Sequence, residues 1–330
     1  MTQRLDWIDI AKGFAITLVV IGHTGRGLSR AGLPDDPGIL GLIDAAIYAF
    51  HMPLFFILSG ITFGMRPPAN IQPVLLQRVW RLFYAMVIWT YVFLAMRALA
   101  GSHSNSGGTW QDMLVWPLPP FQHLWFLWAL LVITVVCALL RFALRPILSD
   151  LAFWACLLGA SVIAFFTIDL SGRLSLLFTD ALNYSMAFVI GALFAVSPVF
   201  RIVPAWPVAA LGGLAFAAAL WVGVFVGLPG FKVVSGSVIS LCLLVPLISL
   251  SARFGQAGWL RGLAYLGMLS LPIYVMHTMF SGALRIGLVQ AGITDLALHL
   301  FLGVAIGILG PLAAYRAARR LGSLRLVGLA

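Results

Sequence analysis

Long apolar runs separated by short polar segments occupy most of the chain. A helix needs about 20 apolar residues to cross the hydrocarbon core of a bilayer, and ten stretches of about this length can be found. The pattern therefore predicts an all-α, polytopic integral membrane protein with about ten transmembrane helices. The expected spans are residues 8–27, 41–64, 79–100, 123–142, 150–168, 177–196, 205–227, 231–250, 262–282 and 296–315.

Composition supports a membrane protein without a separate soluble domain. Of the 330 residues, 62% are hydrophobic and 9% are charged, whereas soluble domains carry about 25% charged residues. We expect residues 1–330 to form a single membrane-embedded domain. The N-terminal apolar region has no small-residue cleavage site, and Asp9 and Lys12 interrupt it, so we interpret it as a retained first span and not as a signal peptide. The three cysteines have a spacing that fits no metal site, and no metal is predicted.

The basic residues predict how the spans are oriented. Cytoplasmic loops of membrane proteins are enriched in Lys and Arg, so the N-terminus is placed inside. Thirteen basic residues then lie on the cytoplasmic side: Arg4, Arg66, Arg78, Arg81, Arg141, Arg145, Arg201, Arg253, Arg261, Arg316, Arg319, Arg320 and Arg325. Six lie on the outer side: Arg26, Arg30, Arg97, Arg173, Lys232 and Arg285. The bias favours ten helices with both termini in the cytoplasm. It also accounts for the formal net charge of +10 without a nucleic-acid partner.

The first span carries three ionisable residues on one predicted helix face. Lys12 and His23 are eleven positions apart, which is just over three turns, or about 16.5 Å along the axis. Asp9 precedes Lys12 by three positions and can pair with it. Because ionisable groups inside a span are costly, they indicate a functional site. The alternative is that Lys12 and His23 extend to the inner and outer headgroups, respectively.

Further histidines fall in the outer half or near the middle of predicted spans. His51 stands beside Pro53, which must break or kink the second span, and Asp44 lies seven positions earlier on the same face. A kink beside a histidine can open a polar cavity, although His51 could instead bind a carbonyl that the kink frees. His277 also follows a proline in the ninth span, and His123 begins the fourth span beside tryptophans typical of a membrane interface.

Two arginines lie at the inner end of the third span. Arg78 and Arg81, in "QRVWRLFY", are spaced i, i+3 and therefore share a helix face. Positive residues commonly anchor the cytoplasmic end of a span. The functional alternative is a pair that binds the phosphates of an anionic cytosolic ligand.

Five sequence segments in this order resemble the membrane acyltransferases of acyltransferase family 3, with the closest likeness to the fucose 4-O-acetylase-like acetyltransferases. They are "DWIDIAKGFAITLVVIGHT", "FHMPLFFILSGITFG", "RVWRLFY", "HLWFLWALL" and "LSLPIYVMH". The resemblance implies a ten-helix enzyme of the bacterial inner membrane that moves an acyl group, usually acetyl from cytosolic acetyl-CoA, to sugar hydroxyls. The family pattern of Arg, ten residues and His places its His on His23 and its Arg on Lys12. Lysine keeps the charge but lacks the bidentate fork of arginine.

The resulting hypothesis is O-acetylation of a surface, exported or lipid-linked glycan. His23 would act as general base or would carry the acetyl group, and Lys12, held by Asp9, would stabilise charge on the donor. Acyl-CoA, the glycan acceptor and membrane lipids are the expected partners. Arg78 and Arg81 are the candidates for binding CoA phosphates, and the candidates for contacting the acceptor or orienting His23 are His51, Asp44, His123 and His277.

A transporter or flippase for a glycan or small molecule is the alternative function. Intramembrane His, Asp and Lys would then form a proton relay. Secondary transporters often contain internal repeats, and no clear repeat is visible in the chain. An enzyme would consume acetyl-CoA without a gradient, whereas a transporter needs two compartments and modifies nothing. A membrane scaffold is a third possibility, which the buried Lys and His disfavour.

Overall fold

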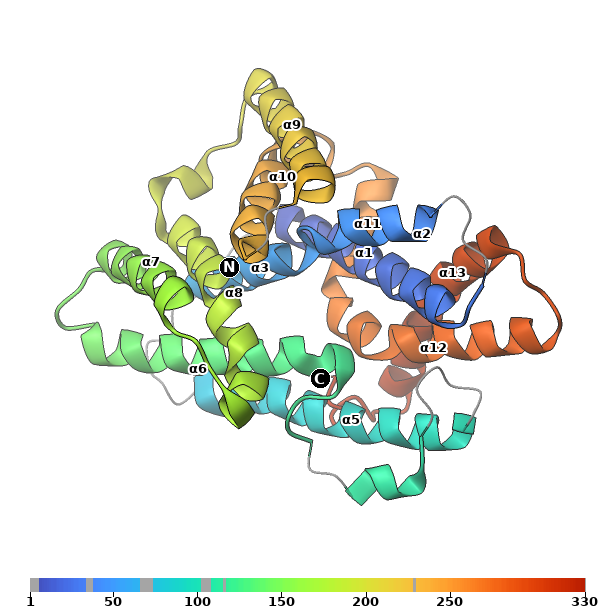
Figure 1. The fold of residues 1–330 in the computed structure, drawn as a ribbon. Coiled ribbons are helices and arrows are strands. Elements are labelled where there is room, and N and C mark those ends of the chain that lie inside the picture. The colour runs from blue at the N-terminus through green and yellow to red at the C-terminus, as the bar shows by residue number, and fades with distance from the viewer. Residues whose placement is uncertain are drawn as a thin grey trace. The chain divides into compact units, whose positions relative to one another are not determined.

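A computed structural model describes residues 6–33, 38–65, 74–101, 108–114, 117–227 and 230–329. Every regular element in these ranges is a helix (Figure 1). Among the described residues, nine helices are long and apolar enough to cross a membrane, and the number rises to ten if one sharply bent helix pair counts as a single span. The prediction of an all-α polytopic membrane protein is confirmed. The cytoplasmic location of both termini stays a prediction.

The chain divides into two compact units, which are described separately. The first unit comprises Met1–His51, Tyr91–Val115 and Pro204–Ala330, and the second comprises Met52–Thr90 and Trp116–Val203. Each unit is therefore assembled from segments that are far apart in the sequence.

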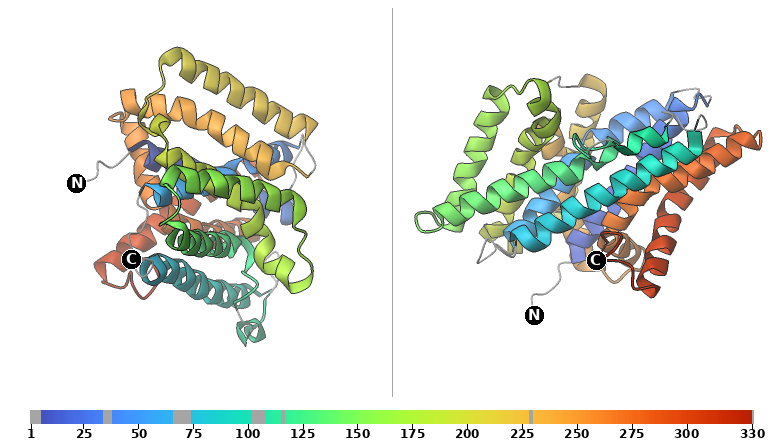
Figure 2. Two further views of the ribbon diagram at one scale, coloured as in Figure 1. Left: turned by 90° about the vertical axis from the view of Figure 1, so that its left-hand side faces the viewer. Right: turned by 90° about the horizontal axis from the view of Figure 1, so that it is seen from below.

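In the first unit, helix α1 (Asp6–Arg30) packs against five other helices. These are α2 (Ile39–Tyr48), α10 (Lys232–Phe254), α11 (Gly258–Met268), α12 (Ser270–Gln290) and α13 (Leu296–Arg320). The unit also contains α9 (Trp206–Trp221) with its π-helical extension η6 (Val222–Val226), the second half of α5 (Trp80–Ala100), and η3 (Trp110–Leu114). Helices α9 and α10 lie side by side (Figure 2). Of the candidate spans, α1 is the most buried, and its residues Asp9, Lys12, His23 and Arg26 are half-buried.

The second unit contains a tight crossing of two helices around an aromatic core. Its elements are α3 (His51–Gly64), η1 (Val74–Val79), the first half of α5, η4 (Gln122–Leu124), α6 (Trp125–Leu144), α7 (Asp150–Thr167), α8 (Gly172–Val196) and η5 (Pro198–Arg201). A Cβ atom on Gly60 of α3 would overlap a backbone carbonyl of α8. The Phe56 ring stacks on Tyr184 with centroids 4.7 Å apart, and Trp125 also lies against Tyr184. Trp125 is half-buried and packs against α3 and α8 within this unit, and its place at a membrane interface stays a prediction.

The second span is interrupted, as the Pro53 position predicts. Helix α2 ends at Tyr48 and α3 begins at His51, so Pro53 is the third residue of the new helix, where its missing N–H leaves no intrahelical bond unmade. In the apolar interior, the backbone groups at such a break need partners. The Ser240 hydroxyl of α10 lies 3.1 Å from the Phe50 carbonyl at the break and 2.7 Å from the Gly236 carbonyl of its own helix, so these two carbonyls share its single proton.

The ninth span differs from its prediction as one helix over 262–282. It is split at Leu269 into α11 and α12, which are bent by 84° relative to each other. Pro272 is the third residue of α12, in the same position that Pro53 has in α3. Apolar character alone cannot distinguish a straight span from such a pair, because both halves are hydrophobic. The proline, which cannot continue a helix through its own nitrogen, was the available signal.

The N-terminal half of α1 and the short helix α11 approach so closely that side chains are excluded. A Cβ atom on Gly13 would overlap the Leu263 carbonyl oxygen, and one on Gly267 would overlap the Asp9 carbonyl oxygen. Small residues allow helix backbones to meet in this way in membranes. The crossing fixes α11 against the turn of α1 that carries Lys12.

Candidate active site

His23 of α1 and His277 of α12 face each other within the first unit. Their ring centroids are 5.1 Å apart with a 60° angle between the ring planes. The His277 side chain is completely buried, and its Nδ1 lies 2.8 Å from the Tyr274 carbonyl and 3.0 Å from the Ile273 carbonyl. Carbonyl oxygens only accept hydrogen bonds, so Nδ1 must carry the proton, and Nε2 of the neutral ring is then an acceptor. The backbone of α12 thus fixes both the orientation and the tautomer of His277.

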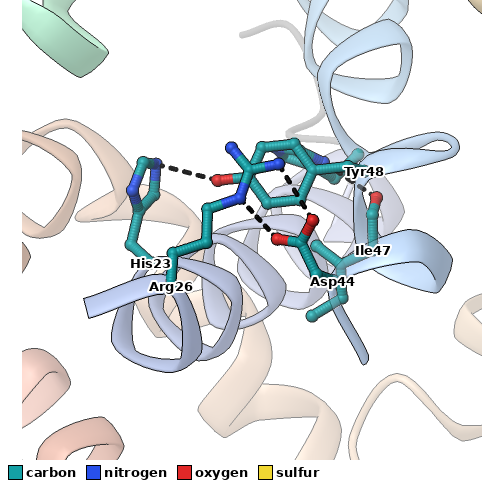
Figure 3. Close-up of polar contacts among 6 residues, drawn as sticks. His23, Arg26, Asp44, Ile47 and Tyr48 are labelled. Atoms are coloured by element: carbon teal, nitrogen blue, oxygen red, sulfur yellow. Dashed lines mark hydrogen bonds and ion pairs between the residues drawn. The ribbon is translucent and has the colours of Figure 1, made fainter. Parts of the chain in front are cut away.

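The end of α2 brings a tyrosine to the same place. The Tyr48 hydroxyl lies 3.4 Å from Nε2 of His23 (Figure 3). The Tyr48 ring also meets the His51 ring edge to face, with centroids 4.4 Å apart. Nδ1 of His51 lies 2.8 Å from the Ile47 carbonyl, which also accepts the Phe50 N–H, so His51 binds a carbonyl beside the break that is not left free by it. We call His23, His277, Tyr48 and the residues bound to them the polar cluster. His51 contacts this cluster through the Tyr48 ring.

An ion pair closes the cluster on the α2 side. Arg26 binds Asp44 through both ends of its guanidinium group, with Nε 2.5 Å from Oδ1 and Nη2 3.0 Å from Oδ2 (Figure 3). The same guanidinium carbon lies 3.2 Å from the centre of the Tyr48 ring. The sequence placed Asp44 on one face with His51, but α2 ends between these two residues, and Asp44 instead binds Arg26 of α1.

Lys12 and Asp9 lie near the other end of α1. Both side chains are half-buried, and they belong to the part of the helix that α11 crosses. The uninterrupted helix Asp6–Arg30 keeps the predicted spacing, so Lys12 and His23 are separated by about 16.5 Å along the axis. The ion pair between Asp9 and Lys12 stays a prediction.

The remaining candidates belong to the second unit. His123 is buried in the short helix η4, directly after Gln122, whose φ of 44° lies in the left-handed region that non-glycine residues rarely adopt. The Arg78 guanidinium lies over the Phe63 ring at 5.5 Å from its centre, and Arg81 is exposed at the start of α5. Contact of these three residues with donor or acceptor stays a prediction.

Arg26 and Tyr48 are the two cluster residues that sequence reasoning missed. Arg26 was counted as a topology-setting residue outside the membrane, and Tyr48 as part of an apolar span. A weak signal existed, because Arg26 follows His23 by one helical turn and Tyr48 follows the acidic Asp44 by one turn. Only the packing of α2 on α1 shows that the two pairs belong together. The cluster offers a proton acceptor, a phenol and a neutralised cation, which are linked by hydrogen bonds and by the contact of the Arg26 guanidinium with the Tyr48 ring.

Comparison with known proteins identifies the family. The family model for the acyltransferase domain of acyltransferase family 3 matches residues 5–316. Nodulation protein NolL of Mesorhizobium japonicum is 30% identical over 193 residues, which cover 57% of this chain and 47% of that protein. NolL of Sinorhizobium fredii is 30% identical over 164 residues, which cover 49% of this chain and 42% of that protein.

The matches therefore span less than half the length of these two relatives, and no solved structure matches the chain significantly. The family model, in contrast, covers nearly all of it, and it confirms the resemblance carried by the five sequence segments. The chain belongs to the membrane acyltransferases of acyltransferase family 3.

Proposed function

We propose that the protein transfers an acyl group, such as acetyl, from cytosolic acyl-CoA to a hydroxyl of a surface, exported or lipid-linked glycan in the bacterial inner membrane. Membership of the family supports acyl transfer as the reaction class. The observation that carries the assignment of the site is the meeting of His23 with His277 and Tyr48. A histidine in such a polar group is suited to accept a proton near neutral pH.

In the proposed reaction His23 removes the proton from the attacking hydroxyl. The hydroxyl oxygen forms a bond to the thioester carbonyl carbon, the carbon–sulfur bond breaks, and the proton held by His23 neutralises the departing CoA thiolate. Because a thiolate is a good leaving group, the protein mainly has to position the reactants and supply the base. His277 would orient His23 or contact the acceptor, since its Nε2 is an acceptor beside the same site.

The donor-side residues complete the proposal. Lys12, near the opposite end of α1 from His23, would stabilise negative charge on the donor, and Arg78 and Arg81 would bind CoA phosphates. His51, Asp44 and His123 would serve the acceptor side, His51 and Asp44 through Tyr48 and Arg26. Membrane lipids would surround the spans, and a lipid-linked acceptor could enter from them.

His23 could also carry the acyl group transiently, and this form of the proposal is separable by experiment. Incubation of the purified protein with [acetyl-¹⁴C]acetyl-CoA in the absence of acceptor, followed by acid quench and peptide mass spectrometry, would trap an acetyl group on the His23 peptide. Direct transfer predicts that no label stays on this peptide.

The central experiment compares His23→Ala with a matched histidine variant, His299→Gln. His299 is also buried in the first unit, and its Nε2 lies 2.8 Å from the Ile293 carbonyl, a bond that the glutamine amide can replace. Both variants and the wild type are reconstituted with [acetyl-¹⁴C]acetyl-CoA and total glycan extracted from the expressing cells. We expect label in glycan for wild type and His299→Gln and none for His23→Ala, although all three fold.

Full activity of His23→Ala would overturn the role of His23. Glycan movement across sealed vesicles without consumption of acetyl-CoA would instead support the transporter alternative and would contradict the proposed reaction. Mass spectrometry of surface glycans from cells with and without the gene would then locate the acetyl group on its acceptor.

A further inference from the structure

Two parallel polar contacts connect α1 and α2 beside the proposed base. His23 and Arg26 are separated by one turn of α1, and Asp44 and Tyr48 by one turn of α2. His23 meets Tyr48, and Arg26 meets Asp44 (Figure 3). The two contacts therefore occupy successive turns of both helices, and movement of one affects the other.

Tyr48 links the two contacts, because its hydroxyl lies opposite His23 and its ring lies under the Arg26 guanidinium. The ring is held on several sides. The Arg26 guanidinium covers one face at 3.2 Å from the ring centre, and the His51 ring meets it edge to face. Gly22 of α1 lies against the ring edge, where an added Cβ atom would stand 3.1 Å from Cε2 of Tyr48. A ring restrained in this way places its hydroxyl in a defined position opposite His23.

Asp44 compensates the charge of the Arg26 guanidinium that lies over the Tyr48 ring. Asp44 supplies a bidentate partner that holds the half-buried Arg26 guanidinium in a fixed geometry. The cation is attracted to the aromatic face and holds the ring in place. The phenol O–H can then donate to Nε2 of His23 in the tautomer whose proton is on Nδ1.

We propose that Tyr48, held by the Arg26–Asp44 pair, is a positioning residue that keeps His23 in the neutral tautomer with Nε2 available as the base. The tautomer of a histidine is set by the hydrogen bonds of its ring nitrogens. At 3.4 Å the contact from Tyr48 is long, so the acceptor hydroxyl can displace the phenol from Nε2 at little cost. The inference rests on the proposed function of His23 as base.

Tyr48→Phe removes the hydroxyl and leaves the ring under Arg26. We expect kcat for acetyl transfer to fall roughly 10- to 100-fold, while KM for acetyl-CoA changes little, because the donor does not bind through this hydroxyl. The matched control is Tyr265→Phe. Tyr265 accepts a hydrogen bond of 3.1 Å from Arg316 and lies under the same guanidinium group, but it belongs to α11, and its substitution should leave kcat unchanged.

A double variant separates positioning from general structural support. Asp44→Asn should lower kcat in the same direction as Tyr48→Phe but less, because Arg26 keeps one hydrogen bond to the amide oxygen. If Asp44 acts through the Tyr48 hydroxyl, the double variant Asp44→Asn/Tyr48→Phe should be no slower than Tyr48→Phe alone. Independent losses that multiply in the double variant would overturn the inference, as would wild-type kcat in Tyr48→Phe.

The wild type and His23→Ala are measured in the same assay, which separates this inference from the proposed function. Activity in His23→Ala, or no transfer by the wild type, contradicts the proposed function itself. An inactive His23→Ala together with a fully active Tyr48→Phe contradicts only the positioning role of Tyr48.

Discussion

The two ends of α1 are held by different kinds of contact. Near Lys12, α1 meets α11 through Gly13 and Gly267, and backbone lies directly against backbone. Near His23, α1 meets α2 and α12 through an imidazole, a phenol and an ion pair. One end excludes side chains, whereas the other is filled with polar ones.

This difference separates a rigid support from a site that can exchange partners. Close-packed backbone cannot adjust by more than small amounts without loss of contact. Hydrogen bonds between side chains can be replaced by those of a substrate, especially where one of them is long. The glycine crossing thus holds α1 in place. The polar cluster at the other end can exchange its hydrogen bonds for those of a substrate. Each substitution below tests one side of this comparison.

Gly13→Ala should have the largest effect on the fold. The new Cβ would overlap the Leu263 carbonyl oxygen, which belongs to a helix backbone and cannot rotate away as a side chain can. We expect a loss of about 3 kcal/mol of stability, the upper end of the usual cost of overpacking, measured by thermal unfolding in detergent, together with low yield of monodisperse protein. Gly262→Ala of α11, whose added Cβ meets no atom within 4 Å, is the control. Wild-type stability of Gly13→Ala would show that the crossing is looser than described.

After His23→Ala, which is expected to abolish transfer, His277→Asn should have the largest effect on activity. The asparagine amide can still donate to the Tyr274 and Ile273 carbonyls in place of Nδ1, but Nε2 is lost. We expect kcat for acetyl transfer to fall about 100-fold, with a melting temperature close to that of the wild type. Unchanged kcat would restrict the function of His277 to packing against His23.

The long apolar runs predicted the spans well because a bilayer imposes the same length on every helix that crosses it. Even 177–196, which Asp180 and Asn183 dilute, lies within the helix Gly172–Val196. The apolar pattern does not predict the bend at Leu269, because hydropathy shows that a segment is apolar but not in which direction its helix runs. Pro272 in the first turn of α12 marks this break in the sequence, as Pro53 does in the second span.

The candidate site was predictable in part. His23, His51, Asp44 and His277 were found as ionisable residues that cost energy to keep in a span, and the structure places all four in the first unit around one cluster. Which residues touch depends on how α2 and α12 pack on α1, and one sequence holds no direct record of this packing. Tyr48 was missed for a related reason, since a tyrosine in an apolar run carries no charge to attract attention.

Substitutions of Lys12 test whether the end of α1 that packs against α11 also takes part in the reaction. If its charge stabilises the donor, Lys12→Ala should lower kcat/KM for acetyl-CoA roughly tenfold, and Lys12→Arg should retain most of the activity because it keeps the charge. Melting temperatures of the three proteins control for packing against α11. Equal activities would support the interpretation that Lys12 only reaches the headgroup layer.

Gly22→Ala should have the smallest effect and is the sharpest counterpart to Gly13→Ala, because the same change is made about two and a half turns later on the same helix. The added Cβ would lie 3.1 Å from an edge atom of the Tyr48 ring, and a ring can move by a few tenths of an ångström where a carbonyl cannot. Alanine also favours the helix over glycine by up to about 1 kcal/mol. We therefore expect stability within about 1 kcal/mol of the wild type and a decrease in kcat of about fivefold, which corresponds to a weaker Tyr48 contact with His23. Gly27→Ala, whose Cβ meets nothing within 4 Å, should leave kcat unchanged in the same assay. A collapse of stability in Gly22→Ala would mean that the His23 end is packed as rigidly as the Lys12 end, and the contrast between them would fail.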